Sequence, residues 1–276
     1  MEEMQFIMIS YEELVCLLLM CGYSNGIAGM QVPEFDYSDE EKKKFIEANQ
    51  HKLIDSKFLT INENGKTDLD QDIAHLLFVL MNHQAAYIMI RSFPETGVQE
   101  QVTYEICGKD ILEHFAHKNG MHRFAILPTP DDLYDRIRQL VPIKDVRPDD
   151  PEVYIITEDS LHEIISQVKQ GVIDESLGKL KNIGMSDELA KNCISGIKDP
   201  DVSVSIMGIA YEDQLAIKVT SVAVFTNGES LWGIWPVEDE KLKRSEEKEV
   251  ALFECIQSDV VSVFRKWVDY LYNTEE

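Results

Sequence analysis

The chain has 276 residues, with 26 Lys or Arg against 50 Asp or Glu, which gives a formal net charge of −24 at pH 7. This charge argues against nucleic acid and anionic membranes as partners, because binding to phosphates requires clustered basic side chains. It favours solubility and would attract a basic partner. The length and a hydrophobic fraction of 44% suit one large domain or two small ones, each with a packed core.

Targeting signals are not expected. The longest apolar run, residues 14–21, is far shorter than the roughly 18 residues that a membrane-spanning helix needs. The first residues include Glu2 and Glu3, which are unlike the basic start of a secretory signal. Five scattered cysteines without a CxxC pair are typical of buried thiols in a reducing cytoplasm. We therefore expect a cytoplasmic protein.

The first half predicts helices followed by a strand meander. A strand is expected at 5–9, and Ser10 with Glu13 forms a capping box for a helix that ends at Gly22. Ser38 begins a second helix that runs to Lys57. The remaining expected elements are an extended arm with an Asn64–Gly65 turn, a helix at 70–82, strands at 85–93, 99–107, 111–118 and 122–127, and a helix at 131–141.

The second half predicts the same layout. Residues 143–152 are charged and rich in proline, which indicates a linker. Helices are expected at 157–169, 173–181 and 186–195, then three antiparallel strands within 201–237 and a long helix at 246–272. Asn227–Gly228 predicts a type I′ turn between the last two strands. The expected fold class is α+β, a central and mostly antiparallel sheet flanked by helices, in quasi-repeated halves at 1–142 and 153–276 that form one compact unit.

Two patterns could indicate catalysis or metal binding. Residues 22–26 match GxSxG, but a helix precedes them where a nucleophile elbow needs a strand, so a helix end followed by a loop is expected. His114, His117 and His122 cluster in sequence. On a strand the first two point to opposite faces, so surface or half-buried histidines are expected here.

A calcium loop and an aromatic binding surface were the other possibilities. Residues 60–71 lack the first Asp and the final Glu of a calcium loop, and a turn followed by a capped helix explains them. Trp232 and Trp235 suit the core better than an interface, since both lie in a scaffold strand. No catalytic residue, cofactor site or metal site is expected.

Several segments resemble the EspG-like proteins of type VII secretion systems. FIMI followed by SYEELVCLLL matches their first strand and Leu-rich helix, and HKLIDSKFLTI and NGKTDLDQDIAHLLFVL match the next helices. AYIMIRS matches a strand that ends in Arg, and DDLYDRIRQLVP matches the helix that closes the first half. LWGIWPV matches the Trp-containing strand before the terminal helix. The acidic, Lys-rich composition fits a Firmicutes-type relative.

The resemblance implies a cytosolic chaperone without an active site. Such a protein binds the helical-hairpin export domain of a secreted effector, keeps it soluble and delivers it to the secretion machinery. In that family, the loop between the second and third strands and the helices of the second half contact the substrate. The matching partner-binding residues here are Phe93, Pro94, Glu95, Thr96, Val98, Leu177, Ile183, Met185 and Leu189. A homodimer is left open.

An immunity protein or antitoxin is the alternative function. Such proteins are also small and acidic and lack catalytic motifs, and they bind and neutralise a partner toxin. The partner separates the two functions, because a chaperone leaves toxin activity intact and an immunity protein abolishes it.

Overall fold

The structure is a computed structural model that describes residues 6–23, 37–142, 152–212, 215–237 and 247–273. Its helices are α1 (Tyr11–Met20), α2 (Asp39–Asp55), α3 (Gln71–Asn82), α4 (Pro130–Leu140), α5 (Glu158–Lys169), α6 (Ile173–Asn182), α7 (Asp187–Lys198) and α8 (Gln257–Asn273). Its strands are β1 (Ile7–Ser10), β2 (Leu59–Ile61), β3 (Thr67–Leu69), β4 (Ala85–Phe93), β5 (Val98–Cys107), β6 (Asp110–Ala116), β7 (Met121–Leu127), β8 (Tyr154–Thr157), β9 (Val202–Glu212), β10 (Leu215–Thr226), β11 (Leu231–Pro236) and β12 (Glu249–Glu254).

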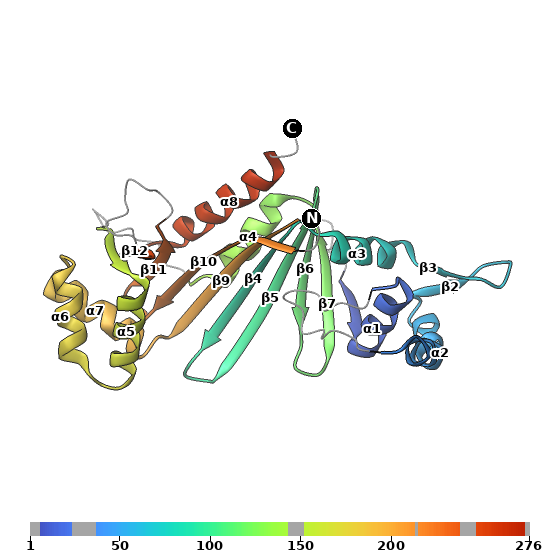
Figure 1. Cartoon of the computed structure of the whole chain (residues 1–276), viewed down its shortest axis with the longest axis horizontal. Coiled ribbons are helices and arrows are strands. Elements are labelled where there is room, and N and C mark those ends of the chain that lie inside the picture. The colour runs from blue at the N-terminus through green and yellow to red at the C-terminus, as the bar shows by residue number, and fades with distance from the viewer. Residues whose placement is uncertain (1–5, 24–36, 143–151, 213–214, 238–246, 274–276) are drawn as a thin grey trace. The chain divides into compact units, whose positions relative to one another are not determined.

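Ten of these strands form one sheet, in the order β1-β7-β6-β5-β4-β9-β10-β11-β12-β8 (Figure 1). Strands β2 and β3 form a separate hairpin. The expected fold class is confirmed: the protein is α+β, with an antiparallel sheet and helices. No helix of the described segments is long and apolar enough to cross a membrane. The predicted linker, apart from Glu152, and Ser24 of the GxSxG pattern lie outside the described residues.

The chain divides into two compact units. The first unit contains 1–88, 101–130 and 209–218, and the second contains 89–100, 131–208 and 219–276. The core of the first unit is built by the apolar faces of α1 and α3, which pack with Ile9, Leu112 and Phe124 of the sheet. Leu53 of α2 joins the same core. The helical period of Ile73, Leu76, Leu77 and Leu80 directs the apolar residues of α3 to one side, whereas α1 is buried all round from Glu13 to Leu19.

The core of the second unit is built by α5, α6 and α7, which appear as one yellow group in Figure 1. They pack against Phe225, Trp232 and Leu252 from three strands of the sheet. Helices α4 and α8 also contact each other in this unit, where the Arg265 guanidinium lies over the Tyr134 ring at 4.9 Å. Burial of the Phe225 and Trp232 side chains contributes about 1.5–3 kcal/mol each to stability.

The two halves of the chain repeat one element order: a strand, helices, a four-stranded meander and a closing helix. The correspondence extends to the strand registers. Ser10, which caps α1, pairs with the first residue of β7, and Thr157, which caps α5, pairs with the first residue of β12. Backbone hydrogen bonds repeat as well, from Gln84 N to Ile106 O and from Asp201 N to Thr226 O, both at 2.8 Å. The quasi-repeat expected from the layout is thus present in the pairing of individual residues.

The long helix expected at 246–272 is wrong in its first part. Residues 249–254 form strand β12, which pairs with β11 on one side and β8 on the other. Helix α8 begins only at Gln257, where Asp259 Oδ2 accepts a 3.0 Å hydrogen bond from the Ile256 N–H. Apolar residues at 250 and 253 fit a helical period, but over six residues a strand fits equally well. Strand β8 was not expected, since it has only four residues and its last residue, Thr157, is also the cap of α5.

The hairpin at Asn227–Gly228 is confirmed, but its turn type is wrong. Thr226 pairs with Leu231, so the turn contains four residues and not two. Gly228 has a φ of +82°, whereas Asn227 does not have a positive φ. The Asn227 side chain accepts hydrogen bonds from the N–H groups of Glu229 and Ser230, each at 3.1 Å. These side-chain contacts replace the type I′ geometry.

Candidate functional site

The first part of the predicted site is the tip of the β4–β5 hairpin. Phe93 ends β4, and a turn leads to Val98, the first residue of β5. The turn is closed by hydrogen bonds from Thr96 N to Phe93 O at 3.2 Å and from Gly97 N to Pro94 O at 3.3 Å. Gly97 has a φ of +64°, which L side chains rarely adopt, so a glycine suits this position.

The side chains at this tip are available to a partner. Pro94, Glu95, Thr96 and Val98 are exposed, and Phe93 is half-buried. The Arg91 guanidinium lies over the Phe93 ring, 4.5 Å from its centroid. The guanidinium cation is attracted by the face of the Phe93 ring, and this contact restricts the orientation of the ring. The tip therefore presents an apolar surface on a turn whose backbone is closed by hydrogen bonds and whose Phe93 ring is held by Arg91.

The second part of the predicted site lies on helices α5, α6 and α7. Thr157 and Ser186 cap α5 and α7 by accepting hydrogen bonds from backbone N–H groups. Leu177, Ile183 and Leu189 are half-buried and pack against the core of the second unit. Met185 is buried within that core. Leu177, Ile183 and Leu189 thus keep part of their surface exposed, whereas Met185, in the connection between α6 and α7, does not.

Salt bridges connect the ends of these helices. Asp187, the first residue of α7, forms one with Lys181 of α6 and another, at 2.6 Å, with Lys191 one turn further along α7. Hydrogen bonds from Lys181 and then Lys191 lower the pKa of Asp187 to about 2. Lys179 pairs with Glu163 in the same way between α6 and α5. The contacts of Asp187 are exposed, so they contribute little to the stability of the fold, whereas Lys179 is half-buried.

The hairpin tip and the three helices belong to the same compact unit. Residues 89–100 cluster with 131–208, although about 60 residues of sequence separate the tip from α5. The first turns of α5, α6 and α7 each carry two acidic residues. The candidate site therefore combines exposed apolar residues with carboxylates at the helix starts.

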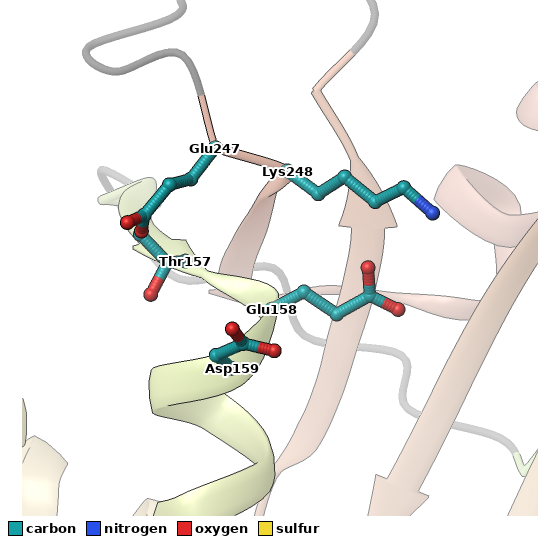
Figure 2. A pocket seen from close by; sticks show the side chains of 5 residues that line it. All are labelled: Thr157, Glu158, Asp159, Glu247 and Lys248. Atoms are coloured by element: carbon teal, nitrogen blue, oxygen red, sulfur yellow. The ribbon is translucent and has the colours of Figure 1, made fainter.

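A pocket of about 200 Å³ lies at the N-terminus of α5, lined by Thr157, Glu158, Asp159, Glu247 and Lys248 (Figure 2). The Glu158 N–H donates a 2.8 Å hydrogen bond to the Lys248 carbonyl, which joins the start of the helix to β12. In Figure 2 the Glu158 and Lys248 side chains extend in the same direction. Across the described segments, no group of three or more His, Cys, Asp or Glu is arranged to hold a metal ion. The polar residues that line the pocket are explained by their place at the N-terminus of α5, where unpaired N–H groups need hydrogen-bond partners.

The histidine cluster differs from the expectation. His114 and His122 are buried, not surface or half-buried, and their ring nitrogens Nε2 and Nδ1 lie 2.9 Å apart. Their rings stack with a centroid distance of 5.1 Å, and His114 also stacks on Phe124 at 4.7 Å. Burial, and then the neighbouring His122, lower the pKa of His114 to about 3. Both rings are therefore neutral core residues at pH 7, and only His117 is half-buried as expected.

The remaining patterns have structural explanations. Gly22, with a φ of +78°, ends α1, and a helix precedes the GxSxG pattern as expected. Residues 59–69 form the β2–β3 hairpin, and Asp70 caps α3, so the turn-and-cap interpretation of the calcium-like segment is confirmed. Trp232 is fully buried, and the half-buried Trp235 lies against Phe253 with ring centroids 4.6 Å apart.

The sequence did not identify Arg91 as a residue that positions the tip. Its cation–π partner, Phe93, lies two positions further along the strand, and such a pair has no distinct sequence pattern. The sequence also did not identify the exposed apolar side chains at the start of β10. Leu215, Ile217 and Val219 alternate there, a pattern that a buried strand face shares, so only the structure separates the two.

Comparison with known proteins identifies the fold. The family model described as "Uncharacterised protein YfjC" matches residues 6–255. No curated protein matches the chain. A solved structure of the Mycobacterium tuberculosis type VII secretion system chaperone EspG5, in complex with the PE25–PPE41 dimer, is similar with a TM-score of 0.69. The similarity covers 94% of each chain at 10% sequence identity. The protein therefore has an EspG-like fold, and the chain belongs to the family described as YfjC.

Proposed function

We propose that this protein is a cytosolic chaperone that binds a helical substrate of a type VII secretion system, keeps it soluble and delivers it to the secretion machinery. The observation that carries the proposal is the similarity to EspG5 along nearly the whole of both chains. EspG5 was solved in complex with the PE25–PPE41 dimer. A shared fold alone does not determine function, so the residues of the candidate site must also suit such a substrate.

The chemistry of the site suits such a substrate. An export domain that exposes apolar residues at the tip of a helical hairpin would aggregate in water. The hairpin tip at 93–98 offers Phe93 and Val98, and the helices offer Leu177, Ile183 and Leu189. Acidic residues at the helix starts would form a solvated rim around this apolar contact. Such an interface binds reversibly and limits self-association.

The test is binding of the cognate effector's export domain to tip variants. Phe93→Glu and Val98→Asp remove apolar contact area and place a charge at the interface, so each should weaken binding by about tenfold or more. Calorimetric titration measures the loss. Phe93→Leu and Val98→Ile keep the tip apolar and serve as matched controls that should bind like the wild type. The thermal melt of the Val98 variant should not change, because that side chain is exposed.

Unchanged affinity in both charged variants would remove the hairpin tip from the binding site. The same titration with the effector's toxin domain tests the alternative function. An immunity protein would bind that domain and abolish its activity, whereas the chaperone proposed here binds the export domain and leaves toxin activity intact.

A further inference from the structure

Arg91, beside the tip of the β4–β5 hairpin, has no acceptor for its N–H groups. Its guanidinium lies over the Phe93 ring, 4.5 Å from the centroid, but a ring face accepts no ordinary hydrogen bond. Among the described residues Arg91 forms no hydrogen bond and no ion pair, and its Nε is removed from solvent without an acceptor. Glu95 and Glu100 belong to the same hairpin, yet neither forms an ion pair with Arg91.

Other arginines of the described chain pair with carboxylates. Salt bridges join three of them to aspartate or glutamate: Arg138 to Asp135 at 2.5 Å, Arg123 to Glu113 at 3.4 Å and Arg265 to Asp131 at 3.6 Å. Carboxylates are plentiful in this chain, which has 50 Asp or Glu against 26 Lys or Arg. The donors of Arg91 are therefore left for a group outside the chain.

The hairpin places this cation next to the apolar surface of the tip. Arg91 and Phe93 are alternate residues of β4, so their side chains lie on the same face of the strand. On the other face, Gln99 Nε2 donates a 3.4 Å hydrogen bond to Ser92 Oγ, which joins the two strands just before the turn. A partner that covers Phe93 would therefore also cover the guanidinium.

Covering an arginine without giving it an acceptor is unfavourable. A charged group that loses water and gains no partner costs several kcal/mol, so a stable contact at the tip requires an acceptor from the partner. A carboxylate suits this need best, because its two oxygens can accept two parallel hydrogen bonds from the planar guanidinium.

We propose that Arg91 binds a carboxylate of the substrate, next to the apolar residues that contact Phe93, and so determines which substrates the tip accepts. This inference rests on the proposed function. The net charge of −24 repels acidic proteins at long range, so the substrate carries this carboxylate on a surface that is not acidic as a whole. A substrate with Lys or Arg at the same place would bring two cations together and would be rejected.

Calorimetric titration with the export domain of the cognate effector tests the role of Arg91. Arg91→Met keeps an unbranched apolar side chain but removes the charge and the donors, so binding should weaken by about tenfold or more. Arg91→Lys keeps the charge without the planar pair of donors and should bind with intermediate affinity. Arg138→Met is the matched control, since Arg138 already pairs with Asp135 and lies on α4, outside the candidate site. This control should bind like the wild type.

Charge reversal separates carboxylate binding from the effect of Arg91 on the Phe93 ring. Arg91→Glu should bind the unaltered export domain about tenfold or more weakly. Replacing one Asp or Glu near the tip of the export domain by Arg should restore about tenfold of that affinity, while it weakens binding to the wild type. A guanidinium that only orients Phe93, or that binds backbone carbonyl groups, would show no such coupling.

Two results would overturn the assignment of Arg91 alone. They are equal affinities of Arg91→Met and Arg138→Met, and the absence of coupling between Arg91→Glu and every carboxylate near the export-domain tip, in each case while the wild type binds and Phe93→Glu does not. An export domain that fails to bind the wild type would instead overturn the proposed function, and the carboxylate contact with it.

Discussion

Glu105 and the histidine pair occupy core positions that the other half of the chain fills with apolar residues. The strand registers match Glu105 with Phe225, and His114 with Ile234. His122 corresponds to Val250 in the same way, since they pair with Ile9 and Ile156. The fold therefore does not require ionisable groups at these positions. They make the core of the first unit sensitive to pH, whereas the matching positions of the second unit cannot titrate.

Glu105 gives a specific pH dependence of stability. Burial raises its pKa to about 8 from an ordinary value of 4.5. The folded state therefore holds a proton that the unfolded state has released, and the contribution of Glu105 to stability falls as the pH rises from about 4.5 to about 8. Between pH 5 and pH 8 the loss is roughly 3 kcal/mol. Urea unfolding of the wild type and of Glu105→Gln is measured at both pH values. The change in unfolding free energy between the two pH values should differ between the two proteins by this amount, because the histidine pair contributes equally to both.

Glu63→Gln, on the exposed turn of the β2–β3 hairpin, is the control and should keep the wild-type pH dependence. Parallel stability curves for the wild type and Glu105→Gln would mean that Glu105 is already ionised in the folded protein at pH 7.

Most of the elements could be predicted from sequence because their signals are local. The capping boxes at Ser10 and Ser38 lie where expected, and of the two candidate caps for the third helix, Asp68 and Asp70, it is Asp70 that caps it. The meander at 85–127 was predictable because each strand is bounded by a turn that contains glycine or proline. Strands β8 and β12 were not, since they are stabilised by each other and by β11, partners that are distant in sequence.

The placement of the candidate site was less predictable than its elements. Periodicity shows that a leucine lies on an apolar helix face, but not how much of it the neighbouring helix covers. Leu177 and Leu180 of α6 therefore look equivalent in sequence, although the first is half-buried and the second buried. The apolar run at 215–219 has the same limitation, because alternation alone does not reveal that the side chains of Leu215, Ile217 and Val219 are exposed.

Strand β11 illustrates how one small residue supports an element. A Cβ atom at Gly233 would lie 1.6 Å from Cζ3 of Trp235, whose ring covers this position. Gly233→Ala should therefore displace that ring and reduce the unfolding free energy by about 1–3 kcal/mol. The measurement is chemical denaturation of four proteins: the wild type, Gly233→Ala, Trp235→Ala and the double variant.

In the double variant the alanine at 233 has no ring to displace. Gly233→Ala should therefore reduce the unfolding free energy much less in the Trp235→Ala background than in the wild-type background. The difference is the coupling energy between the two positions. Additive losses in the double variant would show that the ring does not restrict position 233.

At the scale of the whole molecule, the repeated element order separates scaffold from function. The registers that the halves share belong to the fold. The features in which the halves differ include the β2–β3 hairpin and the ionisable core of the first unit. The short β4–β5 tip is assigned to the proposed substrate contact. The ten-stranded sheet and its helices give the protein its EspG-like fold.

The most direct test of the central claim is amide hydrogen–deuterium exchange with and without the export domain of the cognate effector. We expect slower amide exchange in residues 93–98 and in α5, α6 and α7 when the export domain is bound, because the contact excludes water from these segments. Exchange in the β2–β3 hairpin should not change. Unchanged exchange at 93–98 and in all three helices, with the export domain bound elsewhere or not bound at all, would contradict it.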